Sequence, residues 1–455
     1  MSRDKSVSKK QHHARRAKGN VAIDPSSFDQ RLRQRSLNPE PSHAVPEVIL
    51  TSPIRQPLVY QKRIKKWPTK AADGDLVSVW APFKIDDERA KEIRLIGFGF
   101  FNSKAEIAVR IVSFGPTIPD EEFWNEKVCQ AISLRRDLLK LDSQCNTYRV
   151  IHAESDGFSG LMVDRYDSII SAEVFSLAMY QRSEALVSLI ARQLNCDHYL
   201  IRTAPHVLSQ EGFDGPDISS PNLPKSVVVH ESGTRFQISF DRDAHKTGFF
   251  CDQRENRKRL AKYCEGKSVL DLCCYTGGFS VQAKKLGGAA EVIGVDLDQA
   301  PLESAKRNAN LNQCQIRFVN ADIFPYMRDA IREGKLFDIV VLDPPKLIRS
   351  RMELEEGRKA HFDMNRLAVR LVRPGGILVT CTCAGLLGNE AFLETVLAAC
   401  RSSSRETADD SLATAMQRTV IGRIIARTGA GEDHPIGSNC PETEYLHAIW
   451  MQVVE

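Results

Sequence analysis

The stretch Ser268-Val-Leu-Asp-Leu-Cys-Cys-Tyr-Thr-Gly-Gly-Phe-Ser280 decides the fold of the C-terminal half of this chain. A short apolar run containing Asp271 ends in a loop with Gly277 and Gly278, and a helix-like segment begins at Phe279. A strand, a glycine loop and a helix in this order open a nucleotide-binding α/β sheet. Glycines in such a loop let the backbone approach a ligand closely, because they carry no Cβ atom.

The next apolar run ends in Asp296, where a carboxylate can accept hydrogen bonds from a ribose diol. The loop lacks the G-x-G-x-x-G fingerprint, so a nicotinamide or flavin dinucleotide is the less favoured ligand. D-x5-G-G followed by an acidic strand end resembles motifs I and II of class I S-adenosylmethionine (SAM) methyltransferases. That resemblance implies that Asp296 binds the ribose of SAM. It also implies that the methionine end of SAM faces Asp271, Tyr275, Thr276, Gly277, Gly278 and Phe279.

The N-terminal segment differs in composition from the rest of the chain. Its first twenty residues hold seven Lys or Arg and one Asp, whereas the net charge of all 455 residues is only +4. Residues 1–45 offer too little apolar surface to offset chain entropy, so we expect a disordered basic tail. A merely solvated tail is one interpretation, and an arm that attracts RNA phosphates is the other.

The overall composition is typical of a globular cytoplasmic protein. Apolar residues make up 42% of the sequence, and a chain of this length forms about two to four domains. No apolar run reaches the roughly 18 residues that a membrane helix needs, and no signal-peptide core is present at the N-terminus. The twelve cysteines have the spacing of neither a disulfide framework nor a zinc site. We therefore expect reduced thiols, no metal and no membrane partner.

Short strand-like runs predict a small β-barrel over residues 46–115. The runs lie near residues 48–50, 76–80, 93–96 and 108–112. We interpret residues 97–102, which contain two glycines and three phenylalanines, as a turn between the last two runs. The order of the elements resembles the PUA domain, an RNA-binding barrel, and thereby implies RNA contact. A purely structural barrel is the alternative.

We assign residues 116–225 to an α+β connecting domain and residues 226–455 to a methyltransferase domain. The segment from Asp243 to Arg254 stands just before the first sheet strand and combines polar donors, a glycine and two aromatic residues. Such a segment could fold over a bound cofactor, although a plain connecting loop is the alternative. The cofactor contacts predicted in it are Lys246, Gly248, Asp252, Gln253 and Arg254.

Beyond Asp296 the alternation of strands and helices continues to the C-terminus. Asp322 follows a strand and suits a contact with adenine, through its carboxylate or the nearby backbone. Another strand ends in Asp343-Pro-Pro-Lys346, where the prolines fix a rigid exit and hold Asp343 at the carboxyl edge, at which α/β ligands bind. Seven strands with a terminal antiparallel pair predict an α/β fold of the Rossmann-like, class I methyltransferase type.

Two cysteines, Cys381 and Cys383, lie at the end of the fifth predicted strand, within Thr380-Cys-Thr-Cys-Ala-Gly385. Methylation at carbon 5 of a pyrimidine needs a thiolate, which adds to carbon 6 and makes carbon 5 nucleophilic. The sequence places a cysteine beside the predicted SAM crevice, although both thiols could equally be small buried hydrophobic groups. Methylation of an exocyclic amine is the chemical competitor, and it is disfavoured because Lys346 stands where such enzymes usually carry an aromatic residue.

Taken together, the chain from about Pro57 to Val453 resembles the PUA-containing large-subunit ribosomal RNA 5-methylcytosine methyltransferases. The motifs that carry the resemblance are Glu154-Ser-Asp-Gly157, His245-Lys-Thr-Gly248, Asp252-Gln-Arg254, Tyr275-Thr-Gly-Gly-Phe279, Asp343-Pro-Pro-Lys346, Cys383-Ala-Gly385 and Asp433-His-Pro435.

The resemblance implies that Cys383 is the nucleophile, with Asp343 and Lys346 as further catalytic residues. It also implies SAM as the methyl donor and large-subunit ribosomal RNA, not DNA, as the partner, and it is compatible with a homodimer. Two alternatives stay open. The enzyme could methylate a guanine nitrogen without using Cys383, or the chain could be an RNA-binding factor with a vestigial SAM fold.

Overall fold

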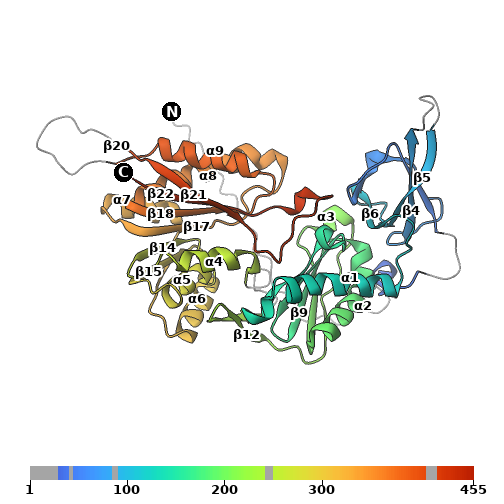
Figure 1. Ribbon diagram of the computed structural model, residues 1–455, viewed down its shortest axis with the longest axis horizontal. Helices are drawn as coiled ribbons and strands as arrows, with labels where there is room; N and C mark the ends of the chain where they lie inside the picture. The colour runs from blue at the N-terminus through green and yellow to red at the C-terminus, as the bar shows by residue number, and fades with distance from the viewer. Residues whose placement is uncertain (1–28, 40–44, 85–90, 241–248, 406–417, 455) are drawn as a thin grey trace, which may run out of the picture.

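The computed structural model describes residues 29–39, 45–84, 91–240, 249–405 and 418–454. The chain forms three bodies that follow one another along its longest axis (Figure 1). A barrel lies at one end, a five-stranded sheet with helices lies in the middle, and a seven-stranded sheet with helices on both faces lies at the other end.

The first body is a six-stranded β-barrel. Its strands are hydrogen-bonded in the order β2-β6-β5-β4-β1-β3 and enclose an apolar core. Their bounds are β1 Glu47–Leu50, β2 Leu58–Tyr60, β3 Ile64–Lys66, β4 Leu76–Lys84, β5 Lys91–Phe101 and β6 Ile107–Phe114.

The turn predicted at residues 97–102 is wrong, because residues 97–101 belong to strand β5. A Cβ atom on Gly97 would lie 2.0 Å from the backbone oxygen of Ser113, and one on Gly99 would lie 2.6 Å from that of Arg110. The two glycines therefore let β5 approach β6 closely where the register between these strands shifts.

The middle body is built on a sheet with the order β11-β10-β9-β8-β7. Its core surrounds the fully buried Trp124, whose ring centroid lies 5.4 Å from that of Phe158. Phe100 and Val112 of the barrel join the same core, so the two bodies share apolar packing. The elements are α1 Glu121–Ser133, β7 Thr147–His152, β8 Leu161–Tyr166, β9 Ile169–Val174, α2 Leu177–Leu194, β10 His198–Thr203, α3 Val207–Glu211 and β11 Ile218–Ser219.

Residues 29–39 are ordered against this middle body. Leu32 and Leu37 are buried in its core, and the side chain of Arg35 pairs with Asp75 at 2.6 Å. The prediction that all of residues 1–45 are disordered is therefore wrong for this stretch. Its few apolar side chains suffice because they add to an existing core instead of forming one.

The third body begins with a hairpin and contains the predicted parallel sheet. The strand order is β16-β15-β14-β17-β18-β22-β21, with β22 antiparallel to both of its neighbours. This is the predicted Rossmann-like layout, and the fold class is confirmed. The hairpin strands are β12 Ser226–Glu231 and β13 Thr234–Ser239, and the sheet strands are β14 Ser268–Leu272, β15 Glu291–Asp296, β16 Arg317–Asn320, β17 Phe337–Leu342, β18 Val372–Thr382, β21 Gly422–Gly429 and β22 His447–Val453.

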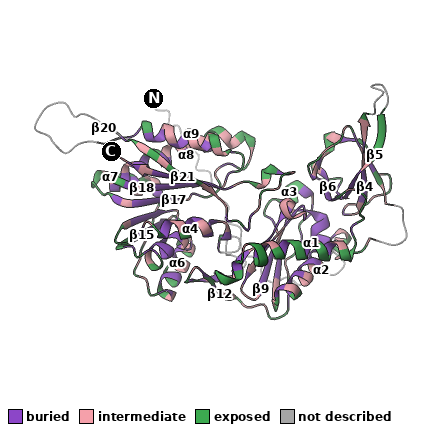
Figure 2. Ribbon diagram, in the orientation of Figure 1, coloured by how far each residue is buried: buried purple, intermediate pink, exposed green. Residues whose placement is uncertain are grey.

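Helices cover both faces of this sheet, so most residues of its central strands are buried (Figure 2). Alternate residues of β14 and β17 face opposite helical layers, as pleating requires. One layer contains α4 Arg254–Ala261, α5 Gly278–Lys285 and α6 Gln299–Leu311, and the other contains α7 Ile323–Arg332, α8 Leu354–Ala368 and α9 Asn389–Arg401.

A buried carboxylate, Asp433, connects the middle body to the third body. Its two oxygens accept hydrogen bonds from the guanidinium of Arg254 at 2.8 and 3.1 Å, and one of them also accepts from the backbone nitrogen of Arg149 at 2.7 Å. The backbone oxygen of Asp433 accepts a bond from Arg135, a fully buried residue of the middle body. Burial alone raises the pKa of Asp433, but the charges of His434 and Arg254 lower it well below its usual range.

Replacing Asp433 by Asn should destabilise the protein by about 3 kcal/mol or more, because it leaves the buried charge of Arg254 with only the partly exposed Glu255 as counterion. Urea denaturation followed by tryptophan fluorescence would measure the loss. Glu303→Gln is the matched control, since it removes a carboxylate from an exposed pair with Lys306 and should leave the midpoint unchanged. Equal midpoints for Asp433→Asn and wild type would contradict the role given to this ion pair.

Candidate active site

The loop after β14 has an unusual backbone that positions its residues at the carboxyl edge of the sheet. Cys273, Tyr275 and Gly277 have positive φ angles of 61°, 49° and 80°. For the two non-glycine residues this conformation costs energy, and such strain concentrates at functional sites. Asn308 of α6 holds the loop by donating a hydrogen bond to the backbone oxygen of Thr276 at 3.0 Å.

Asp296 ends β15 and faces this loop. One carboxylate oxygen accepts a hydrogen bond from the backbone nitrogen of Tyr275 at 2.8 Å, and the other accepts one from that of Asp298 at 3.0 Å. The structure therefore brings the predicted ribose-binding residue together with the glycine loop. Asp322 lies at the start of α7, where its carboxylate caps the helix by accepting a bond from Phe324.

Asp271 is buried beneath the loop. One of its oxygens accepts bonds from the backbone nitrogen and the hydroxyl of Ser280 at 3.0 and 2.6 Å, whereas the buried Oδ1 has no partner among the described residues. Burial, with a smaller contribution from the charge of Asp296, raises its pKa to about 7. An unpartnered buried oxygen at this edge fits a ligand with a hydrogen-bond donor, such as the ammonium group of SAM.

Asp343 follows β17 directly and lies beside Asp271. Burial raises its pKa to about 7, and the neighbouring charges of Asp252 and Asp271 add to this effect. The charge of Arg257 and a hydrogen bond from the side chain of Gln253 act in the opposite direction. At neutral pH Asp343 is therefore divided between its acid and carboxylate forms.

The two cysteines at the end of β18 lie in different surroundings. Cys381 is inside the strand and fully buried, and burial raises its pKa well above the usual range. Cys383 is the first residue after the strand, and it is half-buried. The alternation of side chains along the strand could not distinguish the two thiols, but their burial does.

The remaining residues predicted from the sequence lie in different places. Gln253 lies at the site, because its side chain hydrogen-bonds both Asp343 and Cys381. Arg254 instead forms the buried ion pair with Asp433, which gives it a structural role. Lys246 and Gly248 lie outside the described residues. Lys346 is exposed on the segment after Asp343.

Two residues of the site were not predicted from the sequence. Arg257 of α4 is buried, pairs with Glu231 at 2.6 Å and packs on the glycine loop, where a Cβ on Gly278 would lie 3.2 Å from its Cδ atom. Tyr445 precedes β22, and its hydroxyl donates a hydrogen bond of 2.5 Å to Asp252. Arg257 lies in the same helix as Arg254, and this proximity to a predicted site residue could have indicated it. Tyr445 stands in no sequence motif that would have indicated it.

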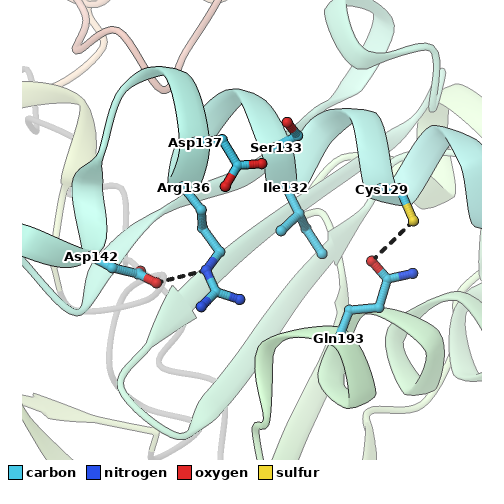
Figure 3. Close-up of a pocket in the computed structure, with 7 residues that line it drawn as sticks. All are labelled: Cys129, Ile132, Ser133, Arg136, Asp137, Asp142 and Gln193. Atoms are coloured by element: carbon cyan, nitrogen blue, oxygen red, sulfur yellow. Dashed lines mark hydrogen bonds and ion pairs between the residues drawn. The ribbon is translucent and has the colours of Figure 1, made fainter.

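A separate hollow of about 440 Å³ lies on the middle body (Figure 3). Its polar side chains bond to one another, with Arg136 pairing with Asp142 at 2.7 Å and Cys129 contacting Gln193 at 3.6 Å. None of the residues that line it belongs to the third body, so it is separate from the predicted SAM site at the carboxyl edge of the seven-stranded sheet.

In the described ranges there is no cluster of three or more potential metal ligands. No helix in the same ranges is long and apolar enough to span a membrane.

Comparison with known proteins identifies the family. Residues 216–406 match the S-adenosylmethionine-dependent methyltransferase family. Ribosomal RNA large subunit methyltransferase I of Photobacterium profundum is 32% identical, covering 86% of this chain and 94% of its own length. The enzyme of the same name from Aeromonas hydrophila is 33% identical, with coverages of 87% and 94%. The chain belongs to this family of SAM-dependent methyltransferases.

Solved structures agree with this assignment at the level of the fold. A chain from Streptococcus mutans described as a SAM-dependent methyltransferase superposes with a TM-score of 0.70 at 17% identity, covering 90% of this chain and all of that one. A second solved methyltransferase, in complex with SAH, has a TM-score of 0.71 at 18% identity and the same coverages. The predicted family, the methyltransferase activity and SAM as cofactor are thus confirmed.

Replacing Asp296 by Ala should weaken SAM binding by at least ~1.5 kcal/mol, because a charge-assisted hydrogen bond to the ribose is lost. Isothermal titration calorimetry with SAM would measure this. Asp298→Ala, two residues further along the same loop, is the matched control and should bind SAM as wild type does. A folded Asp296→Ala protein with unchanged affinity would remove Asp296 from the site.

Asp271 should make the SAM-free protein less stable as the pH rises. Its pKa is about 7 when folded and near 3.8 when unfolded, so its contribution to stability is full below pH 4 and is lost between pH 4 and 7. Asp271→Asn cannot ionise and should gain stability relative to wild type across that interval, by at most about 4 kcal/mol. Urea midpoints of both proteins at several pH values would test this, and a difference independent of pH would contradict it.

Proposed function

We propose that this chain uses SAM to form 5-methylcytosine in large-subunit ribosomal RNA through a covalent bond to Cys383. The observation that carries the proposal is the position of a half-buried thiol immediately after β18, beside the strand whose end carries Asp343. The name of the curated relatives supports ribosomal RNA of the large subunit as the substrate.

Cys383 supplies the nucleophile in this mechanism. Its thiolate adds to carbon 6 of the cytosine ring, which makes carbon 5 nucleophilic. Bound SAM supplies an electrophilic methyl group. Cys381 is unsuited to this task, because it is fully buried and its raised pKa disfavours the thiolate.

Asp343 supplies acid–base chemistry at the ring. Because its pKa is about 7, a large fraction of the carboxyl groups carries a proton at neutral pH. The acid form can donate that proton to ring nitrogen 3 when the thiolate attacks, so that negative charge does not accumulate on the ring. We assign the exposed Lys346 to a contact with the phosphate backbone of the substrate strand.

The other bodies are proposed to hold the RNA. We assign residues 46–115 to an RNA-binding barrel, 116–225 to the connecting domain and 226–455 to the methyltransferase domain. The barrel is fixed to the connecting domain by shared apolar packing and by the pair between Arg110 and Glu211 at 2.9 Å. A fixed barrel can set the distance between a bound RNA segment and the target base. The cytoplasmic location and the homodimer stay predictions.

Cys383→Ala should abolish methylation of ribosomal RNA while leaving SAM and RNA binding intact, because only the covalent step is lost. RNA that contains 5-fluorocytidine should trap the wild-type enzyme as a denaturation-resistant adduct, since fluorine cannot leave as a proton does. Nucleoside mass spectrometry and denaturing gels would provide the two readouts.

Cys381→Ala is the matched control and should keep most of the activity and the adduct. An adduct that survives Cys383→Ala but disappears in Cys381→Ala would reverse the assignment. If wild type forms no adduct and Cys383→Ala stays active, the enzyme methylates by direct transfer, as expected for a guanine nitrogen. Absence of any methylation by wild type on every ribosomal RNA substrate would favour a binding factor.

A further inference from the structure

A second carboxyl group, that of Asp252, lies near Asp343. Asp252 belongs to the 3₁₀ turn Cys251–Gln253, and the last residue of this turn, Gln253, hydrogen-bonds both Asp343 and Cys381. After burial, the charge of Asp252 is the largest influence on Asp343, and it also acts on Cys381. The turn thus brings Asp252 close to Asp343 and Cys381, at the carboxyl ends of β17 and β18.

The two oxygens of Asp252 have different partners. Oδ2 accepts the short 2.5 Å hydrogen bond from the Tyr445 hydroxyl. Oδ1 is buried and has no hydrogen-bond partner among the described residues. A buried carboxylate oxygen without a donor is costly, so it calls for an explanation, such as a substrate or a proton that completes the arrangement.

Tyr445 connects Asp252 to the segment that carries Cys383. Strand β22 pairs with β18 so that His447 lies opposite Thr382. Continuing this register places Tyr445 beside the residues after Cys383, and a Cβ on Gly385 would lie only 3.5 Å from the Cβ of Tyr445. Tyr445 therefore holds the carboxylate of Asp252 in a fixed relation to the nucleophile.

We propose that Asp252 is the base that removes the proton from carbon 5, and that Tyr445 positions it. This inference rests on the covalent cytosine mechanism proposed above, and it gives Asp252 a role different from the cofactor contact predicted from the sequence.

The step balances in atoms and electrons. After methyl transfer, carbon 5 carries both the new methyl group and its original proton, and carbon 6 is bonded to the sulfur of Cys383. Oδ1 of Asp252 takes the proton. The electrons of the carbon–hydrogen bond form the carbon 5–carbon 6 double bond, and the carbon–sulfur pair returns to Cys383 as a thiolate. Ring nitrogen 3 returns its proton to Asp343, and solvent later removes the proton from Asp252.

Other groups near the crevice suit this task less well. Asp343 is already bonded by Gln253, and its acid form serves ring nitrogen 3. Cys381 is fully buried inside β18. His361 contacts the hydroxyl of Thr382 at 3.1 Å and packs against Phe392, in the helical layer opposite to α4. Asp252 combines a fixed carboxylate with an acceptor oxygen that no described residue uses.

The test uses the full-length enzyme, SAM and ribosomal RNA with ordinary cytidine. Asp252→Asn should transfer the methyl group but release the product about a hundredfold more slowly, as expected for loss of a general base. A denaturation-resistant adduct containing labelled methyl should therefore accumulate with unmodified RNA, whereas wild type should complete the reaction and leave no such adduct. Tyr445→Phe should lower turnover about tenfold with unchanged SAM affinity and should accumulate some of the same adduct.

Tyr263→Phe is the matched control, since this tyrosine packs on Trp450 away from the crevice, and it should behave as wild type. Asp252→Asn that loses SAM binding and forms no adduct would return Asp252 to the cofactor site and overturn the inference. If the adduct accumulates with Asp343→Asn and not with Asp252→Asn, Asp343 is the residue that removes the carbon 5 proton. Failure of wild type to form the 5-fluorocytidine adduct would instead refute the covalent function itself.

Discussion

The arrangement of the crevice depends on the buried ion pair between Asp433 and Arg254. Arg254 begins α4 directly after the turn that carries Asp252 and Gln253, and Asp433 lies in the segment that leads to Tyr445. One bidentate contact therefore fixes both partners of the Tyr445–Asp252 hydrogen bond. Because Asp433 also accepts a bond from the backbone of Arg149, the same contact fixes the middle body against the methyltransferase domain.

The chemistry of the site follows from desolvation as much as from residue identity. Asp271 and Asp343 are carboxyl groups whose pKa values rise to about 7 because burial penalises their charged forms. In water both would be ionised at neutral pH, and Asp343 could not act as the proton donor proposed above. The same burial separates the two cysteines, since it makes Cys381 inert while Cys383 remains accessible beyond the strand.

The sequence was most informative for site features that a short stretch of neighbouring residues determines. The glycine loop, the acidic ends of β15 and β17 and the thiol after β18 could be found from patterns along the chain. Residues 97–101 were misassigned because their glycines serve close approach of two strands, which only the barrel reveals. Arg254 and Tyr445 could not be assigned because their partners, Asp433 and Asp252, lie 179 and 193 positions away in the chain.

The position of β22 in the sheet has a consequence for how the protein is made. This strand is the last of the sheet to leave the ribosome, yet it pairs with β18 and β21 in the interior of the sheet. Until β22 is synthesised, β18 presents an open edge, and open edges recruit foreign strands. Nascent chains are therefore vulnerable to aggregation until β22 has been synthesised, and the Cys383 segment lacks its support from Tyr445 until the same point.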